Sequence, residues 1–243
     1  MENYGTENVL VNNAMNAAQD KLEYEADGDM RAWNVYDERE QRVKGNSPGV
    51  ARGIREFDSN GYVIRSYYED ENGERMRSAY GWGETENQYD SYGNLVARWS
   101  GDEFGGPGVN EQLEYHGYRL TWDKSGRYNT EIRFFGVDKK TPAIHKRMGA
   151  HGFSMTYDDK GNRTSVSYFD ANESPVARKD YGAAVIEYSY DTEARLVETR
   201  RLGLNGKLSD NNRQAWAVER VSYGDAGIES GRQLFYADMT PFD

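Results

Sequence analysis

The 243-residue sequence contains no cysteine and no apolar run approaching the roughly 18 residues that are needed to cross a bilayer. Disulfide bonds, thiol nucleophiles and cysteine-ligated zinc are therefore excluded. Residues 1–20 also lack the basic and apolar regions of a signal peptide. We expect this chain to be soluble, and its compartment stays unknown.

Aliphatic side chains are scarce, and basic residues are outnumbered by acidic ones. The apolar fraction is 37%, and the formal net charge is −11. Globular proteins typically have about 45–50% apolar residues. The negative charge opposes docking onto nucleic-acid phosphates or anionic lipid. Nineteen tyrosines argue against disorder, so aromatic side chains must supply much of the buried area.

An aromatic marker residue recurs every 32 to 35 residues along the chain. The seven markers, which number repeats 1 to 7, are Tyr24, Phe57, Tyr89, Trp122, Tyr157, Tyr190 and Tyr223. An acidic residue follows six of the seven markers, and glycine lies four positions after six of them. Self-similarity at a fixed period indicates a repeat architecture. We predict a single β-repeat domain over residues 1–243.

The aromatic-Asp-x-x-Gly element is typical of a tight β-hairpin turn. In "TYDDKGNRTSVSYFD", Asp158 suits the first position of a type I turn, and Gly161 suits a backbone with positive φ. Apolar and polar residues alternate before the markers, as in a strand with one packed face. All five prolines lie 18 to 24 residues after a marker, where they exclude a sheet interior. Each repeat is therefore predicted to be strand, tight turn, strand and long Pro/Gly-rich connection.

The two ends of the sequence fall at nearly the same phase of the repeat. Residues 3–24 overlay Phe169 to Tyr190 without a gap, which places Val9 opposite Pro175. A segment of a longer array and a ring closed by its terminal repeats are both compatible with this phase. A short amphipathic helix over "VLVNNAMNAAQDKL" is the alternative for the N-terminal part.

The turns "QYDSYGNL", "TYDDKGNR", "EFDSNGYV" and "TWDKSGRY" resemble the YD repeats of bacterial Rhs and wall-associated proteins and of teneurins. That resemblance implies an antiparallel β-hairpin array with a structural role, and it does not imply toxin delivery. MORN and choline-binding repeats are analogous hairpin arrays. In choline-binding repeats, aromatic side chains of successive hairpins form ligand cages.

Paired carboxylates are common, but an Asp that recurs in most repeats is better explained by turn capping than by catalysis. The clusters "DENGE", Asp70 to Glu74, and "EADGD", Glu25 to Asp29, offer several oxygen ligands for calcium, although neither is an EF-hand. Solvated turns are the simpler interpretation. We therefore predict no metal site and no cofactor.

Three histidines are present, His116, His145 and His151. They show no metal-ligand spacing and no partner set for nucleophilic catalysis, and no nucleotide-binding glycine motif occurs. We interpret them as surface histidines, and we predict no enzymatic activity and no catalytic residue.

Aromatic side chains could either fill a thin core or contact a ligand. The predicted binding-surface residues lie in connections or in "WSGDEFGGPGV", the most divergent loop of the chain. They are Tyr80, Trp82, Trp99, Phe104 and Trp216. Strand arginines such as Arg65, Arg133 and Arg163 are predicted to pair with carboxylates and tyrosines across strands.

The sequence thus predicts an all-β scaffold from a larger bacterial protein, without catalytic activity. Its expected partner is another protein or other domains of the parent protein. A carbohydrate-binding module that uses exposed aromatics is the first alternative, and a glycan-directed hydrolase is the second.

Overall fold

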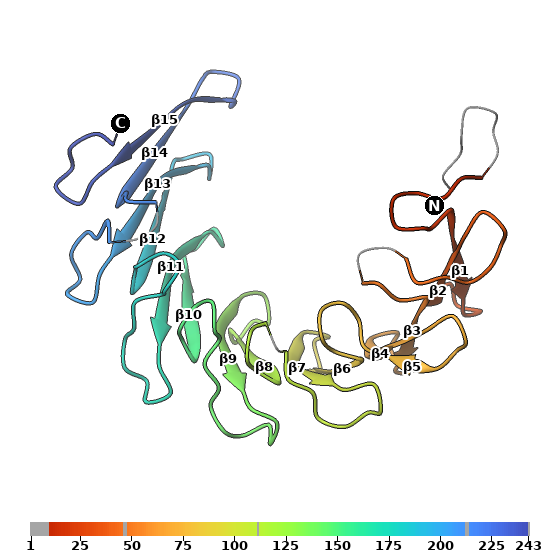
Figure 1. Cartoon of the computed structure of the whole chain (residues 1–243). Helices are drawn as coiled ribbons and strands as arrows, with labels where there is room; N and C mark the ends of the chain where they lie inside the picture. Colours follow the sequence, from red (N-terminus) through yellow and green to blue (C-terminus); the bar gives the residue numbers. More distant parts are fainter. Residues whose placement is uncertain (1–9, 46–47, 111, 212–213, 243) are drawn as a thin grey trace. The chain divides into compact units, whose positions relative to one another are not determined.

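The computed structural model describes residues 10–45, 48–110, 112–211 and 214–242. Its regular elements are all strands, and neighbouring strands run antiparallel (Figure 1). The predicted all-β array of hairpins is confirmed. Within the described part of the chain, no helix is long and apolar enough to cross a membrane.

Each repeat contributes one hairpin of two strands, and the marker residue ends the first of them. The first strands are β1 (Gln19–Tyr24), β3 (Arg52–Phe57), β6 (Glu84–Tyr89), β8 (Gly117–Trp122), β10 (Gly152–Tyr157), β12 (Val185–Tyr190) and β14 (Val218–Tyr223). The second strands are β2 (Met30–Tyr36), β4 (Val63–Glu69), β7 (Leu95–Gly101), β9 (Asn129–Phe135), β11 (Arg163–Phe169), β13 (Leu196–Leu202) and β15 (Glu229–Phe235). A short extra strand, β5 (Arg75–Met76), pairs with β4.

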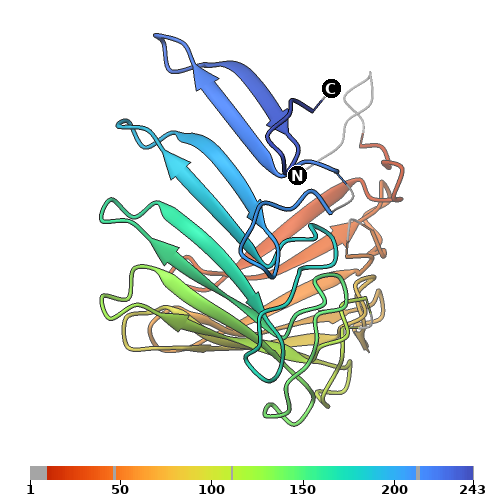
Figure 2. The ribbon, with the colours of Figure 1, turned by 90° about the vertical axis from the view of Figure 1, so that its left-hand side faces the viewer.

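The chain divides into two compact units, Met1–Tyr118 with Gly136–Lys140, and Arg119–Phe135 with Thr141–Asp243. In the first compact unit the strand order is β1-β2-β3-β4-β6-β7, and in the second β9 to β15 lie in chain order. Figure 2 shows the hairpins of β10 to β15 with their tight turns at one end and the longer connections at the other. The prediction of one continuous domain stays a prediction.

The connection after each hairpin is more regular than the predicted Pro/Gly-rich loop. Each repeat contains three turns that end in a residue with positive φ: an entry turn before the first strand, a hairpin turn, and an exit turn after the second strand. The entry turns end at Asn16, Gly49, Gly81, Glu114, Gly149, Gly182 and Ala215. The hairpin turns end at Gly28, Gly61, Gly93, Gly126, Gly161, Ala194 and Gly227. The exit turns end at Glu40, Gly73, Gly105, Lys139, Glu173, Gly206 and Met239.

The proline positions fit these connections. Pro107, Pro142, Pro175 and Pro241 each form an isolated bridge to the last residue of the preceding second strand. The chain therefore turns back after the exit turn and lies beside the sheet for a short stretch. This closes the loop end of the repeat.

The N-terminal helix alternative is wrong over the described residues. Asn13 N–H donates to Ala17 O at 2.8 Å in an entry turn, and β1 follows directly. The positive φ of Asn16 matches that of Gly182, as the overlay on repeat 6 requires. The earlier part of that overlay, with Val9 opposite Pro175, lies outside the described residues.

The core lies at the loop end of the hairpins, which is the end opposite the tight hairpin turns. There the connections pack on the sheet. The repeat position directly before each first strand is mostly occupied by a small residue. Its buried occupants include Ala18, Ala51, Ala184 and Ala217. Aromatic and aliphatic side chains from the ends of the second strands, such as Phe169, complete this core. Small residues allow close approach of the chain, which explains how a sequence poor in aliphatic residues still forms a packed interior.

Candidate functional site

The recurring motif residues have structural roles. Asp158 Oδ1 accepts hydrogen bonds from the backbone N–H groups of Lys160 at 3.0 Å and Asn162 at 2.8 Å. Hydrogen bonds from the Asn162 side chain and the turn backbone lower the pKa of Asp158. The same capping recurs at Asp58 and Asp191. The Asp of the motif is therefore a turn cap, as predicted.

The marker tyrosines join one repeat to the previous one. Tyr157 Oη donates to Asn129 O at 2.8 Å, and Tyr157 stacks on Tyr128 with ring centroids 4.9 Å apart. Tyr89, Tyr190 and Tyr223 make the same hydroxyl contact, each to the first residue of the preceding second strand. These rings and hydroxyls are committed to inter-repeat packing.

The two calcium candidates are turns. Asp70 Oδ1 accepts the backbone N–H groups of Asn72 and Glu74, both at 2.9 Å, in the exit turn of repeat 2. Asp27 Oδ1 accepts the N–H of Asp29 at 3.1 Å in the hairpin turn of repeat 1. Among the described residues, no group of three or more His, Asp or Glu side chains is placed to hold a metal ion.

The interpretation of the histidines as surface residues is wrong, because all three are buried. His116 and His151 occupy the repeat position directly before a first strand, which is mostly held by small residues. Packing at this position encloses their rings. His116 Nδ1 lies 2.6 Å from Gly108 O, and His151 Nδ1 lies 3.1 Å from Ala143 O. Burial lowers the pKa of His145. The periodicity contains this signal for two of them, because His116 and His151 align with Ala18, Ala51 and Ala184.

Two of the five predicted binding-surface residues are buried. Trp99 is 2% exposed, and Trp216 is 8% exposed beneath the guanidinium of Arg201, which lies 3.3 Å from its ring centroid. Trp99 fits against Gly117 of the next first strand, where a Cβ would lie 2.4 Å from the indole. Trp33 fits against Gly53 in the same way. For Trp99, the glycine in the neighbouring repeat was the signal for burial.

The other predicted residues behave differently. Tyr80 is exposed and stacks on the half-buried Trp82 with centroids 5.4 Å apart. Phe104 is 87% exposed at the tip of the exit turn of repeat 3. In the six other exit turns this position is polar. Its occupants there are Arg39, Asn72, Asp138, Asn172, Asn205 and Asp238.

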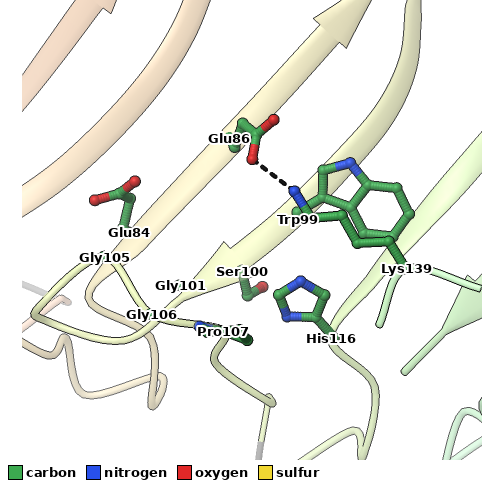
Figure 3. A pocket seen from close by; sticks show the side chains of 10 residues that line it. All are labelled: Glu84, Glu86, Trp99, Ser100, Gly101, Gly105, Gly106, Pro107, His116 and Lys139. Carbon is green, nitrogen blue, oxygen red and sulfur yellow. Dashed lines mark hydrogen bonds and ion pairs between the residues drawn. The ribbon is translucent and has the colours of Figure 1, made fainter. Parts of the chain in front are cut away.

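Behind this exit turn lies a small cavity of about 100 Å³. Its walls are the loop Gly105–Pro107, the strand residues Glu84 and Glu86, and the rings of Trp99 and His116 (Figure 3). His116 stacks on Trp99 with centroids 5.8 Å apart. Its Nδ1 faces Gly108 O, so Nε2 lies on the opposite edge of the ring, and Nε2 has no hydrogen-bond partner among the described residues. The cavity is large enough for a few water molecules or one small polar group.

Lys139 closes the other side of this cavity. Its Nζ lies 2.8 Å from Glu86 Oε2 and 5.3 Å from the ring centroid of Trp99. The hydrogen bond from Lys139 lowers the pKa of Glu86. The Trp99 face and the Glu86 carboxylate both favour a cation. The Lys139 ammonium group of the same chain fills this role.

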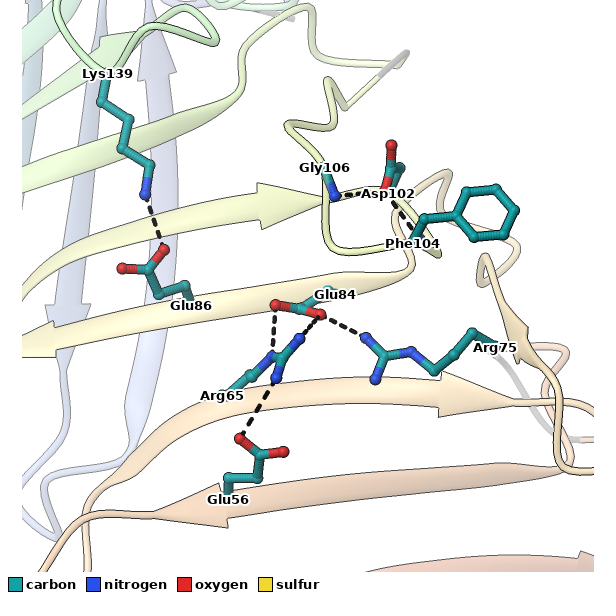
Figure 4. A network of polar contacts seen from close by, with 9 residues as sticks. All are labelled: Glu56, Arg65, Arg75, Glu84, Glu86, Asp102, Phe104, Gly106 and Lys139. Carbon is teal, nitrogen blue, oxygen red and sulfur yellow. Dashed lines mark hydrogen bonds and ion pairs between the residues drawn. The ribbon is translucent and has the colours of Figure 1, made fainter.

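An ion-pair network lies next to the cavity (Figure 4). The buried Glu84 carboxylate accepts from Arg65 at 2.6 and 2.7 Å and also from Arg75. Arg65 Nη1 lies 3.7 Å from Glu56. These hydrogen bonds raise the pKa of Arg65. The predicted pairing of strand arginines is confirmed here and at Arg163, whose guanidinium lies 5.0 Å from the Tyr188 ring centroid.

The exit turn that carries Phe104 lies beside this cavity and network. Asp102 Oδ1 accepts the N–H groups of Phe104 at 2.9 Å and Gly106 at 2.7 Å, which fixes the turn (Figure 4). Figure 4 shows the Phe104 ring directed away from Glu84 and the strands. An apolar ring held outward on a turn that Asp102 fixes is suited to contact a partner.

No protein-family model and no curated protein sequence matches the chain. Solved structures that are similar include the crystal structure of TcdB2-TccC3-TEV, with 14% identity, a TM-score of 0.45, and 93% of this chain aligned to 12% of that one. The structure of TcdB2-TccC3-Cdc42 follows with 13% identity, a TM-score of 0.33, and 90% of this chain aligned to 12% of the other. TcdB2-TccC3 without its hypervariable C-terminal region has 14% identity, a TM-score of 0.19, and coverages of 89% and 13%.

This chain thus spans about an eighth of the length of the solved chains it resembles. Such distant likenesses carry no argument about activity or partners.

Proposed function

We propose that the chain is a non-enzymatic β-repeat scaffold of the YD type, part of a longer bacterial protein, and that it binds a protein partner. The observation that carries this proposal is the internal use of the recurring residues. The marker hydroxyls bond to the preceding repeat, and the acidic residues cap turns. A motif whose polar groups are satisfied within the array builds a platform and leaves little for catalysis.

The protein-binding part of the proposal depends on repeat 3. Aromatic residues occupy the position before the positive-φ glycine in all three of its turns, at Tyr80, Tyr92 and Phe104. All three are exposed, and Phe104 replaces the polar residues of its six counterparts. Exposed aromatic side chains with few rotors are typical anchors for apolar pockets on partner proteins.

Carbohydrate binding has less support in this geometry. A stacking platform needs tryptophan faces open to solvent, but Trp99 and Trp216 are enclosed. Of the predicted tryptophans, only Trp82 is half-buried, and Tyr80 covers one of its faces.

The test compares the wild-type chain with Phe104→Asn, which installs the residue found at Asn72, Asn172 and Asn205. Leu204→Asn is the matched control, because Leu204 is 65% exposed in the exit turn of repeat 6. Proteins from an extract of the natural source are captured and quantified on all three chains, and calorimetry with the purified partner then gives the Kd.

We expect Phe104→Asn to weaken binding by about tenfold or more, as for an interface anchor, while Leu204→Asn binds like wild type. Equal binding by Phe104→Asn would contradict the protein-binding surface. A glycan-array signal that depends on Trp82, or measurable glycan hydrolysis, would contradict the scaffold proposal as a whole.

A further inference from the structure

The residue directly before each second strand closes the hairpin turn, and this repeat position is the stacking position. In repeats 2, 4 and 6 it holds a large planar side chain that packs on the marker of the next repeat. Tyr62 stacks on Tyr89 with ring centroids 5.0 Å apart, and Tyr128 makes the same contact in repeat 4. The Arg195 guanidinium lies 4.9 Å from the Tyr223 ring centroid. The stacking position therefore joins the turn ends of neighbouring hairpins.

The side chains of repeats 1 and 2 cannot form the two contacts that join hairpin ends elsewhere. The stacking position of repeat 1 holds Asp29, which is too short to cover an aromatic ring. The marker of repeat 2 is Phe57, which lacks the hydroxyl that Tyr89 and Tyr223 use to bond to the preceding second strand. An open groove of about 700 Å³ lies between these two hairpins, and the half-buried Phe57 lines it.

Repeat 6 shows which side chain fits such a position. Arg195 Nε donates to Asp191 Oδ2 at 2.7 Å, and its Nη2 donates to Glu193 Oε2 at 3.0 Å. The same guanidinium lies over the Tyr223 ring. A guanidinium is planar and always charged and carries several donors, so it contacts two carboxylates and one ring face at the same time.

The groove beside repeat 1 carries the same three groups without an arginine at the stacking position. Glu25 and Asp27 occupy the repeat positions of Asp191 and Glu193, and Phe57 provides the ring of the next marker. All three residues line the groove, and both acidic side chains are exposed. The contacts that hold a guanidinium in repeat 6 are thus offered to a ligand in repeat 1.

The charge of this groove also favours a cation. A Cβ at Gly61 would lie 3.4 Å from Asp29 Oδ2, so the Asp29 carboxylate faces the next hairpin. Arg31 Nε lies 3.5 Å from Glu25 Oε1, but both side chains are about half exposed, and such a surface pair contributes little. Four carboxylates line the groove against two guanidinium groups, and they belong to Glu25, Asp27, Glu56 and Asp58.

We infer that this groove binds an arginine side chain of a partner protein, with the guanidinium on the Phe57 ring and hydrogen-bonded to Glu25 and Asp27. Lysine is a poorer occupant, because a compact ammonium group neither stacks flat on a ring nor donates in a planar fork. Phe104 is not part of the groove lining, so the Phe104→Asn test and a test of this groove have independent outcomes.

Repeat 5 provides a comparison within the same chain. Its stacking position holds Asn162, and a groove of about 410 Å³ lies beside the next marker, Tyr190. Lys160 occupies the repeat position of Glu193 and donates to Thr192 O at 3.1 Å. A cation at that position repels a guanidinium, so we expect the repeat 5 groove not to bind arginine.

NMR titration of the full 243-residue chain with the blocked tripeptides Gly-Arg-Gly and Gly-Lys-Gly tests the inference. Asp29→Arg places the chain's own guanidinium at the stacking position, as Arg195 is placed in repeat 6. Asn162→Arg is the matched control, because it makes the equivalent change beside the repeat 5 groove. Asp27→Asn removes one carboxylate but keeps the Oδ1 atom that accepts the Asp29 N–H at 3.1 Å.

We expect Gly-Arg-Gly to shift the backbone signals of Glu25, Asp27 and Phe57 and to bind more tightly than Gly-Lys-Gly. Asp29→Arg should weaken this binding by about tenfold or more, because the site is already filled, and Asp27→Asn should weaken it by about threefold. Asn162→Arg should bind like wild type. Equal affinity for the two tripeptides would show charge attraction alone and overturn the inference. The absence of shifts, shifts confined to other residues, or unchanged binding by Asp29→Arg would overturn it as well.

Discussion

At the scale of single residues, the marker tyrosines show how one side chain connects two repeats. Tyr157 is half-buried, and burial raises the pKa of its hydroxyl, which stays protonated and donates to Asn129 O at 2.8 Å. Removing the hydroxyl leaves that carbonyl without this donor while the ring stack on Tyr128 remains.

We therefore expect Tyr157→Phe to lower the free energy of unfolding by about 1 kcal/mol, the usual net value of one hydrogen bond. Urea unfolding followed by circular dichroism measures this change. Tyr92→Phe is the control, since Tyr92 is 72% exposed and should lose nothing measurable. An equal loss in both variants would contradict the inter-repeat role of the hydroxyl.

Ala194 is the residue where the hairpin-turn pattern departs from glycine. It has φ of 63° in a turn that the six other repeats end with glycine. Side chains disfavour this left-handed conformation, whereas glycine adopts it readily. We expect Ala194→Gly to raise the free energy of unfolding by roughly 0.5–1 kcal/mol.

Thermal unfolding of Ala194→Gly, and of the opposite substitution Gly161→Ala at another hairpin turn, checks this expectation. Gly161→Ala should be destabilising, because φ is 90° and an added Cβ would lie 2.3 Å from the Tyr128 hydroxyl. A stabilised Gly161→Ala chain would be inconsistent with this reading of the turn.

At the scale of elements, the hairpin turns depend on ionised aspartates. Hydrogen bonds from the Ser125 hydroxyl and from the backbone of Tyr128 and Arg127 lower the pKa of Asp123 from 3.8 to about 2. The pKa values of Asp58, Asp158 and Asp191 are lowered as well. A depressed pKa in the folded state contributes stability above the unfolded pKa, and this is lost as the pH falls through the folded value.

The chain should therefore lose stability as the pH falls from about 4 to about 2, because protonated carboxyl groups accept these hydrogen bonds less well. Urea midpoints measured from pH 7 to pH 2 test this directly. Asp123→Asn should be less stable at neutral pH and lose less on acidification. An acid limb identical to wild type would show that Asp123 does not contribute to it.

The turns also show which elements the sequence could reveal. Hairpin turns were predictable because marker, acid and glycine recur together. Exit turns were not, because their positive-φ position holds Glu40, Lys139, Glu173 or Met239 in four repeats. Packing of the connection against the sheet imposes that backbone conformation, and no single residue type records it.

At the scale of the whole molecule, a repeat array should tolerate the loss of one complete repeat. Deleting residues 158–190 joins Tyr157 directly to Asp191 and preserves the aromatic-Asp-x-x sequence of the turn. Because each repeat packs mainly on its neighbours, we expect this chain to fold with a modestly changed stability.

Circular dichroism and urea unfolding measure the outcome. Deletion of residues 158–180 is the matched control, since it removes part of a repeat and joins strands out of phase. If both deletions fold equally well, or if neither folds, the nearest-neighbour description of the array is wrong.

The period predicted the architecture, but burial within the candidate site depended on neighbouring repeats. Trp99 was expected at the surface because its loop is divergent, yet Gly117 in the next repeat makes room for its ring. Phe104 is exposed because its exit turn projects from the strands. A sequence read repeat by repeat does not show which side chains the next repeat will cover.

The spacing of the three turns determines where the chain can change length. Twelve residues separate the positive-φ positions of the hairpin and exit turns in every repeat except repeat 4, where there are thirteen. From each exit turn to the next entry turn the interval varies between eight and ten residues. Peptides grafted into that interval would leave both strand registers unchanged. Successive grafts within a compact unit would lie about 10 Å apart, because each repeat adds two strands. The array would therefore display grafted ligands in a row at a regular spacing.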